Sequence, residues 1–86
     1  MKTAITALLN IQYPIILTGM SWISTPELVA AVSNAGGLGI LALGPLTAQE
    51  TKVAILRVRE LTDKPFGVNC ALMMPSAQEN AQIALD

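Results

Sequence analysis

Residues 13–20, YPIILTGM, have the composition of a short buried strand that ends in a glycine turn. Pro14 fits only at the start of such a strand, because proline has no N–H to donate to a ladder. Ile15, Ile16 and Leu17 are apolar without alternation, which is typical of a strand that is covered on both faces in a parallel sheet. The segment therefore predicts one strand of a parallel α/β fold.

The turn after this strand is the first candidate for a binding surface. Gly19 has no side chain, so backbone N–H groups at this point can approach a ligand closely. Ligands of parallel α/β folds bind beyond the carboxyl ends of the strands, where Thr18, Gly19 and Met20 stand. The soft side chain of Met20 could lie against a flat ring or fill space in the core. The alternative interpretation of the three residues is a simple turn.

The same strand–helix pattern follows twice more. Thr25 is the expected N-cap of a helix with Pro26 at its first position, and Gly36-Gly37 is a typical helix stop. Residues 38–43, LGILAL, form the second expected strand. The inward face of the helix is expected at spacing i, i+3, i+4 and i+7, which selects Leu28, Ala31, Val32 and Ala35.

A capping box at residues 47–50 predicts the start of the next helix, which runs to about Leu61. Its expected inner face consists of Thr51, Ala54, Ile55, Val58 and Leu61. Residues 66–72 form the third expected strand, and a second capping box at residues 76–79 starts a last helix. A short amphipathic helix is expected within residues 1–10, with Ile5, Leu8 and Leu9 on its apolar face.

Apolar strands that alternate with helices predict an α/β fold with a parallel sheet and right-handed crossovers. The chain stops inside the last expected helix, and three strands would leave two edges unpaired. We therefore expect residues 1–86 to be the amino-terminal part, a βαβαβα segment, of one TIM (β/α)8 barrel. A complete barrel needs eight such units and roughly 250 residues.

Composition excludes several classes of function. The chain has 86 residues, of which 52% are hydrophobic and 13% charged, so it is not a disordered segment. Its net charge of −1 offers no electrostatic footprint for nucleic acid. One cysteine and no histidine exclude a disulfide framework, argue against a metal site and favour a reducing, cytoplasmic setting. No run of residues is long and apolar enough to predict a membrane span.

Residues 37–42, GLGILA, match the letters of a dinucleotide-binding fingerprint. That fingerprint has to follow a strand and open a helix, so that the pyrophosphate meets the helix N-terminus. Here the glycines follow a helix and enter a strand. We interpret them as a helix stop and a tight turn at the amino end of the sheet.

Asn69 is the most informative polar residue, because it interrupts the apolar third strand. A buried amide must find hydrogen-bond partners. A neighbouring loop could supply them, or the amide could face a heterocycle such as a flavin, whose edge carries donors and acceptors. Cys70 is expected to be a small core residue, since the chain has no histidine to activate it. Trp22 is expected either to cover the site or to close the rim of the barrel.

These motifs together resemble the start of the nitronate monooxygenases, formerly called 2-nitropropane dioxygenases, and of the flavin-dependent enoyl-ACP reductases of the same superfamily. The resemblance covers nearly the whole chain. It rests on YPII at residues 13–16, GM at 19–20, TPELVAAVSNAGGLG at 25–39 and LTDKPFGVN at 61–69. One difference is that many relatives have a glutamine and a small residue where this chain has Leu17 and Thr18.

The resemblance implies an FMN-binding TIM barrel in which the Gly-Met turn and the asparagine of the Gly-Val-Asn motif contact the flavin. Those positions are Gly19, Met20 and Asn69, with Thr18 beside them. The family's catalytic histidine and the loops for the FMN phosphate come from later in the barrel, so no catalytic residue is expected here. The implied activity is oxidation of alkyl nitronates with O2.

Two alternatives to this activity stay open. One is NAD(P)H-dependent reduction of an enoyl thioester on the same scaffold. The other is a non-catalytic truncated chain that self-associates through its open sheet edges.

Overall fold

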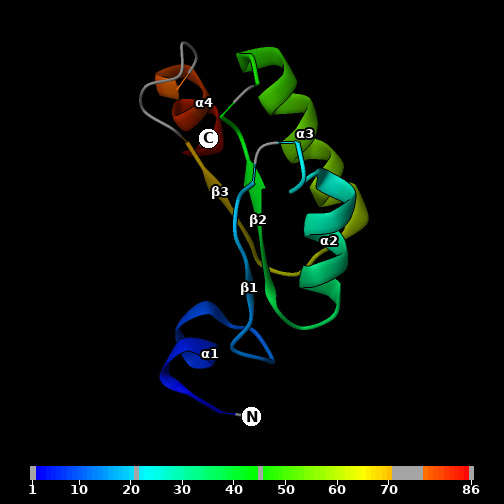
Figure 1. Ribbon diagram of the computed structural model, residues 1–86, viewed down its shortest axis with the longest axis vertical. Coiled ribbons are helices and arrows are strands. Elements are labelled where there is room, and N and C mark those ends of the chain that lie inside the picture. Colours follow the sequence, from blue (N-terminus) through cyan, green and yellow to red (C-terminus); the bar gives the residue numbers. More distant parts are fainter. Residues whose placement is uncertain (1, 21, 45, 71–76, 86) are drawn as a thin grey trace.

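The computed structural model describes residues 2–20, 22–44, 46–70 and 77–85. Helices and strands alternate along the chain after a first short helix, as the sequence pattern predicts (Figure 1). The elements are α1 (Ala4–Leu9), β1 (Ile16–Leu17), α2 (Pro26–Asn34), β2 (Leu38–Ala42), α3 (Ala48–Leu61), β3 (Phe66–Asn69) and α4 (Ala77–Leu85).

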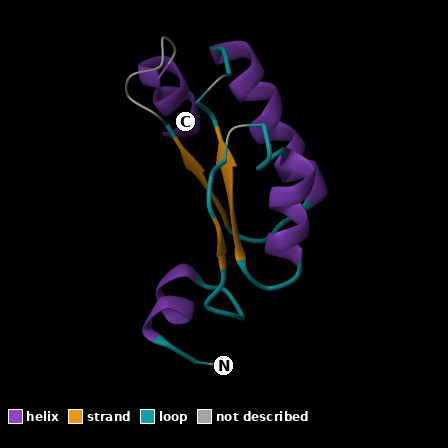
Figure 2. Ribbon diagram, in the orientation of Figure 1, coloured by secondary structure: helices purple, strands orange, loops and turns teal. Residues whose placement is uncertain are grey.

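The strands of the described residues form one sheet in the order β1-β2-β3, and both pairs are parallel. Leu17 is paired with Gly39, and Ala42 is paired with Asn69. All three strand arrows point toward the same end of the molecule (Figure 2). Their carboxyl ends therefore form one edge, which we call the carboxyl rim; it comprises residues 18–20, 42–44 and 69.

Helices α2 and α3 cover one face of the sheet, and α4 packs against α3 (Figure 1). The core lies between that face and the helices. Its buried members are Val29, Leu41, Leu43, Ile55 and Val58. Cys70 is half-buried and packs against this cluster, which agrees with its expected role as a small core residue.

Gly39 sets how closely α2 approaches β2. A Cβ atom on Gly39 would lie 2.9 Å from the Cα of Val29 and would also overlap the Val29 carbonyl oxygen. The Gly39 N–H donates to the Oγ of Ser33, which is buried in α2, at 3.2 Å. The missing side chain thus brings the helix backbone against the strand.

The opposite face of the sheet has no cover among the described residues. On this face Ile16 of β1 is 44% exposed, and Ile15, just before β1, is 63% exposed. Both were expected to be buried, because the strand is apolar on both faces. The sequence predicted a strand covered on both faces, whereas the described part of the chain covers the sheet on one face only.

The ends of α2 and α3 follow the predicted capping chemistry. Thr25 accepts from the Leu28 N–H, with Pro26 next in the chain. After α2, Gly36 has a φ of 106°, and the N–H groups of Gly36 and Gly37 donate to the carbonyls of Ser33 and Val32, which is a Schellman motif.

The capping box before α3 is also confirmed. The Thr47 hydroxyl accepts from the Glu50 N–H at 3.2 Å, and the Glu50 carboxylate accepts from the Thr47 N–H at 3.0 Å. The predicted inner face of this helix is correct, since it holds the buried Thr51, Ile55 and Val58.

The predicted inward face of α2 is wrong. The residues that α2 buries are Val29, Ala30 and Ser33, whereas Leu28 is 38% exposed. Ala31 and Ala35 are also exposed. The reason is that residues 28–32 are all apolar, so spacing alone selects no face. The close approach of α2 at Gly39 decides it instead.

The predicted apolar face of α1 is not buried either. Ile5 is 44% and Leu8 is 79% exposed, and Thr6 is the buried residue of this helix. Figure 1 shows the cause: α1 lies beyond the amino ends of the strands, away from α2 and α3.

The strands are shorter than expected. β1 holds two residues of the predicted segment 13–20, β2 ends at Ala42 and β3 ends at Asn69. The end of the third predicted strand at residues 71–72 and the predicted cap Ser76 lie outside the described residues. Within the described parts of the chain, no helix is long and apolar enough to span a bilayer.

Candidate functional site

Two of the predicted site residues meet directly at the carboxyl rim. The Nδ2 atom of Asn69 donates to the carbonyl oxygen of Gly19 at 3.1 Å. The two residues come from the outer strands of the sheet, and the parallel strand order places them at the same end. The rim therefore joins the end of the third strand to the turn after the first.

The Asn69 side chain reaches Gly19 by passing over β2. The residue of β2 in register with Asn69 is Ala42, whose side chain is small and buried. The backbone completes the junction, because the Leu43 N–H donates to the Asn69 carbonyl at 3.1 Å. The small side chain of Ala42 thus leaves room for the Asn69 side chain to reach Gly19.

Gly19 is needed for this contact. A Cβ atom at position 19 would lie 2.5 Å from the Cγ and Oδ1 atoms of Asn69, which is less than van der Waals contact. The sequence suggested that Gly19 clears space for a ligand. The structure adds that the space beside Gly19 is taken by the Asn69 amide.

Gly19 and Asn69 each have one further polar group that this hydrogen bond does not use. The Gly19 carbonyl only accepts, so the Asn69 nitrogen faces it and Oδ1 is left as an acceptor. Among the described residues, neither Asn69 Oδ1 nor the Gly19 N–H has a hydrogen-bond partner. One donor and one acceptor therefore remain at the rim.

Asn69 is exposed, although the sequence suggested a buried amide. The cost of burying an unpaired amide therefore does not explain its position in this chain. A neighbouring turn takes the nitrogen of the amide, as the first interpretation expected, while the contact of Asn69 with a flavin stays a prediction.

Ser24 is a residue bonded to the carboxyl rim that sequence reasoning missed. Its Oγ atom donates to the Thr18 carbonyl at 2.6 Å and accepts from the Met20 N–H at 3.0 Å. The residue is only 3% exposed. A serine just before an N-cap threonine has no distinctive sequence pattern. What could have indicated its role is that it follows closely, in sequence, a glycine turn whose backbone groups need hydrogen-bond partners.

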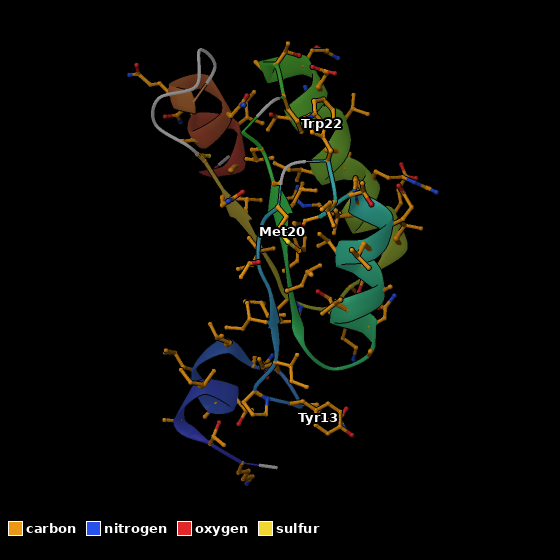
Figure 3. All side chains as sticks on the ribbon, in the orientation of Figure 1. Tyr13, Met20 and Trp22 are labelled. Carbon is orange, nitrogen blue, oxygen red and sulfur yellow. The ribbon has the colours of Figure 1, made fainter. Side chains whose placement is uncertain are left out.

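The side chains of Thr18 and Met20 are both exposed, Met20 to 40%. Figure 3 places Met20 partway along the sheet, between Tyr13 at the amino end and Trp22 at the other. Met20 therefore offers apolar surface at the rim rather than filling the core.

Trp22 has a left-handed backbone, with a φ of 66°, and its exposed fraction is 76%. It lines a groove of about 440 Å³ between the N-terminal ends of α2 and α3. Its groove neighbours include Pro26, Leu46 and Val53. Trp22 thus stands on the helix side of the rim, which fits the expected rim position better than a cover over Gly19 and Asn69.

The glycines of residues 37–42 lie at the amino end of the sheet. Gly37 follows α2, and β2 begins at Leu38, as predicted. This is the end opposite to the carboxyl rim, and the segment leads into a strand rather than into a helix. The segment forms the tight turn that its sequence context predicts.

Two further polar side chains, those of Asn80 and Arg57, have structural partners away from Gly19 and Asn69. The Nδ2 atom of Asn80 in α4 donates to the carbonyls of Leu43 and Leu46, and the side chain is buried. Arg57 pairs with Glu27 and Glu60 on the outer surface. No three His, Cys, Asp or Glu side chains of the described residues come together as a metal site would require.

The family model described as nitronate monooxygenase matches residues 2–86. The chain belongs to the nitronate monooxygenase family. It is 52% identical over 69 residues to (3aS,4S,5R,7aS)-5-hydroxy-7a-methyl-1-oxo-octahydro-1H-indene-4-carboxyl-CoA dehydrogenase of Rhodococcus jostii (strain RHA1), covering 80% of this chain and 20% of that protein. It is 48% identical over 82 residues to nitronate monooxygenase of Pseudomonas aeruginosa, covering 95% of this chain and 23% of that protein.

The solved structure of FabK from Thermotoga maritima has the same fold over this region. The TM-score is 0.93 at 46% identity, and the match covers 96% of this chain and 27% of that one. The segment is thus a parallel βαβαβα unit of the TIM-barrel type found in this family. The chain spans about a fifth to a quarter of the length of the curated relatives it matches.

The rim of this nitronate monooxygenase family member fits a flavin in its chemistry. The polar edge of an isoalloxazine ring carries acceptors and one N–H donor, and the rim keeps the Gly19 N–H and the Asn69 Oδ1 atom without partners among the described residues. The exposed Met20 side chain beside them is apolar and polarisable, as a contact with a flat ring requires.

Proposed function

We propose that residues 1–86 form the amino-terminal part of one FMN-binding TIM-barrel domain, in an oxidoreductase that oxidises alkyl nitronates with O2. The observation that carries the proposal is the hydrogen bond between Asn69 and Gly19 at the carboxyl rim. That edge of parallel α/β folds is where ligands bind. Membership of the nitronate monooxygenase family supports the choice of chemistry.

Four residues of the carboxyl rim have a defined part in this proposal. The Gly19 N–H would donate to an acceptor on the flavin edge, and Asn69 Oδ1 would accept from an N–H. Met20 would lie against the ring, and Thr18 would border it. FMN, when bound, supplies a group that takes electrons from the substrate carbon and passes them to O2. We assign no catalytic residue to this chain, and we place the protein in the cytoplasm on its low cysteine content.

The test is flavin binding and turnover by the protein expressed from its complete gene. The purified protein should absorb at about 450 nm, as a flavoprotein does, and should consume O2 when an alkyl nitronate is added. Asn69→Ala should raise the FMN dissociation constant about tenfold, which corresponds to the loss of one hydrogen bond and of the ordered turn. A colourless protein that consumes no O2 contradicts the proposal.

A matched control for Asn69→Ala is Asn34→Ala. Asn34 is also an exposed asparagine whose Nδ2 donates to a distant backbone carbonyl, that of Leu61, at 3.1 Å. It lies at the end of α2 away from the carboxyl rim. Asn34→Ala should leave the FMN dissociation constant unchanged; an equal loss in both variants would mean that Asn69 acts only through stability.

A second candidate is oxidation or reduction of an acyl thioester by a flavin enzyme of the same scaffold. The observation that favours it is the 52% identity to the CoA-ester dehydrogenase of Rhodococcus jostii. The two candidates differ in which reagent bleaches the flavin absorbance. An alkyl nitronate alone should bleach it in a nitronate monooxygenase, whereas NAD(P)H should bleach it in a thioester reductase.

A third candidate is a non-catalytic chain that self-associates through its open sheet. The exposed Ile15 and Ile16 on β1 and the segment before it favour this interpretation. A colourless oligomer of the protein expressed from its complete gene would support it.

A further inference from the structure

One buried hydroxyl holds the turn that follows β1. The Ser24 Oγ atom donates to the Thr18 carbonyl at 2.6 Å and accepts from the Met20 N–H at 3.0 Å. These two bonds flank Gly19 on both sides. Because the exposed fraction of Ser24 is 3%, water has little access to replace the hydroxyl.

Ser24 is itself fixed by the elements around it. Its N–H donates to the Met20 carbonyl at 2.8 Å, and its carbonyl accepts from the Ala42 N–H of β2 at 3.4 Å. The next residue, Thr25, caps α2. The position of the hydroxyl is therefore set by β2 and α2, which pack against each other.

The turn needs such a fixed point because its middle residue is glycine. Glycine has wide conformational freedom, so a turn centred on Gly19 would adopt several conformations if it were unrestrained. The Asn69 amide holds the Gly19 carbonyl from one side, and Ser24 holds the two flanking residues from the other. Together these bonds leave one orientation for the Gly19 N–H.

We propose that Ser24 is a positioning residue for flavin binding, which orders the Thr18–Gly19–Met20 backbone without touching the flavin. This inference rests on the proposed function, since it assigns the ordered turn to FMN. Ordering the turn before binding lowers the entropy cost of association and so raises affinity. Removing the hydroxyl leaves the Met20 N–H and the Thr18 carbonyl without this hydrogen-bond partner.

The test compares Ser24→Ala with Ser33→Ala in the protein expressed from its complete gene. Ser33 is a matched control, because it is 1% exposed and its hydroxyl also accepts from a backbone N–H, that of Gly39, but away from the carboxyl rim. Ser24→Ala should raise the FMN dissociation constant about tenfold and shift the absorbance bands of the bound flavin. Ser33→Ala should leave both unchanged.

A second measurement needs no flavin. Hydrogen exchange of the Met20 amide in the flavin-free protein should be about tenfold faster in Ser24→Ala than in the wild type, and unchanged in Ser33→Ala. Ser24→Cys keeps a side chain of similar size with only a weak donor and acceptor. It should change binding and exchange in the same direction, and it replaces Ser24→Ala if that variant does not fold.

The outcomes separate this inference from the proposed function. Wild-type binding of FMN together with unchanged affinity in the Ser24 variant overturns the positioning role and leaves the proposed function standing. Equal losses of affinity in the Ser24 and Ser33 variants also overturn the positioning role, because general destabilisation would then be the cause. A wild-type protein that binds no FMN overturns the proposed function and this inference with it.

Discussion

Gly19 illustrates how a missing side chain serves a neighbour rather than a ligand. A Cβ atom there would lie 2.5 Å from the Asn69 amide group, which is the movable end of a side chain. The backbone of Gly19 does not have the positive φ that only glycine tolerates well, unlike that of Gly36. Substitution should therefore displace Asn69 at a small cost in stability.

We predict that Gly19→Ala separates flavin binding from folding. The displaced Asn69 amide no longer holds the turn, so the FMN dissociation constant should rise about tenfold, while the free energy of unfolding should fall by about 1 kcal/mol or less. Fluorescence titration of FMN and urea unfolding measure the two quantities.

Gly67→Ala is the control for that substitution. Among the described residues, a Cβ atom on Gly67 would meet only the Cγ1 atom of Ile40, at 3.5 Å, which is ordinary contact. Both FMN affinity and stability should stay at wild-type values. A loss of affinity in Gly67→Ala as large as in Gly19→Ala would contradict the role assigned to position 19.

At the scale of elements, the sequence predicted the inner face of α3 correctly and that of α2 incorrectly for one reason. The outer face of α3 is marked by charge, at Lys52, Arg57, Arg59 and Glu60, so the inner face follows. Residues 28–32 of α2 carry no charge, and only packing against Gly39 selects Val29 and Ala30 as the buried residues.

The candidate site was likewise predictable in part. The meeting of Gly19 and Asn69 follows from topology, because the carboxyl ends of parallel strands share an edge. Ser24 was not predictable in this way, since its role depends on the path of one loop. The exposure of Asn69 was also missed, because the sequence does not show which face of the sheet the described chain leaves open.

We predict that Gly39→Ala destabilises the fold through α2. The new Cβ atom would meet the backbone of Val29 rather than a movable side chain, so the helix has to shift away from β2. Overpacking of this kind costs about 1–3 kcal/mol. Urea unfolding should show that loss in Gly39→Ala. A cost as small as that of Gly67→Ala would mean that α2 moves freely on the sheet.

At the scale of the whole molecule, the sheet has a covered face and an open one. Helices α2 and α3 shield one side, while Ile16 of β1, on the other side, is 44% exposed. Apolar surface of this kind beside an unpaired strand edge promotes association. In a closed barrel of the TIM type the same face would be interior.

We predict that the 86-residue chain by itself associates and that Ile16→Lys reduces the association. A lysine on the open face makes contact between apolar surfaces unfavourable, so the apparent mass in light scattering should fall toward that of the monomer. Ala31→Lys is the control, because it adds the same charge at an exposed position of α2, behind the covered face. Equal effects of both substitutions would mean that net charge, rather than the open face, governs association.

The span of the Asn69–Gly19 hydrogen bond bears on the order of events during synthesis. The two residues are 50 positions apart in the chain, and β2 lies between their strands. A growing polypeptide that has emerged only as far as β2 possesses the glycine turn but lacks the amide that steadies it. If the rim binds a flavin as proposed, the complete set of rim residues is available for that binding only after the third strand has been synthesised.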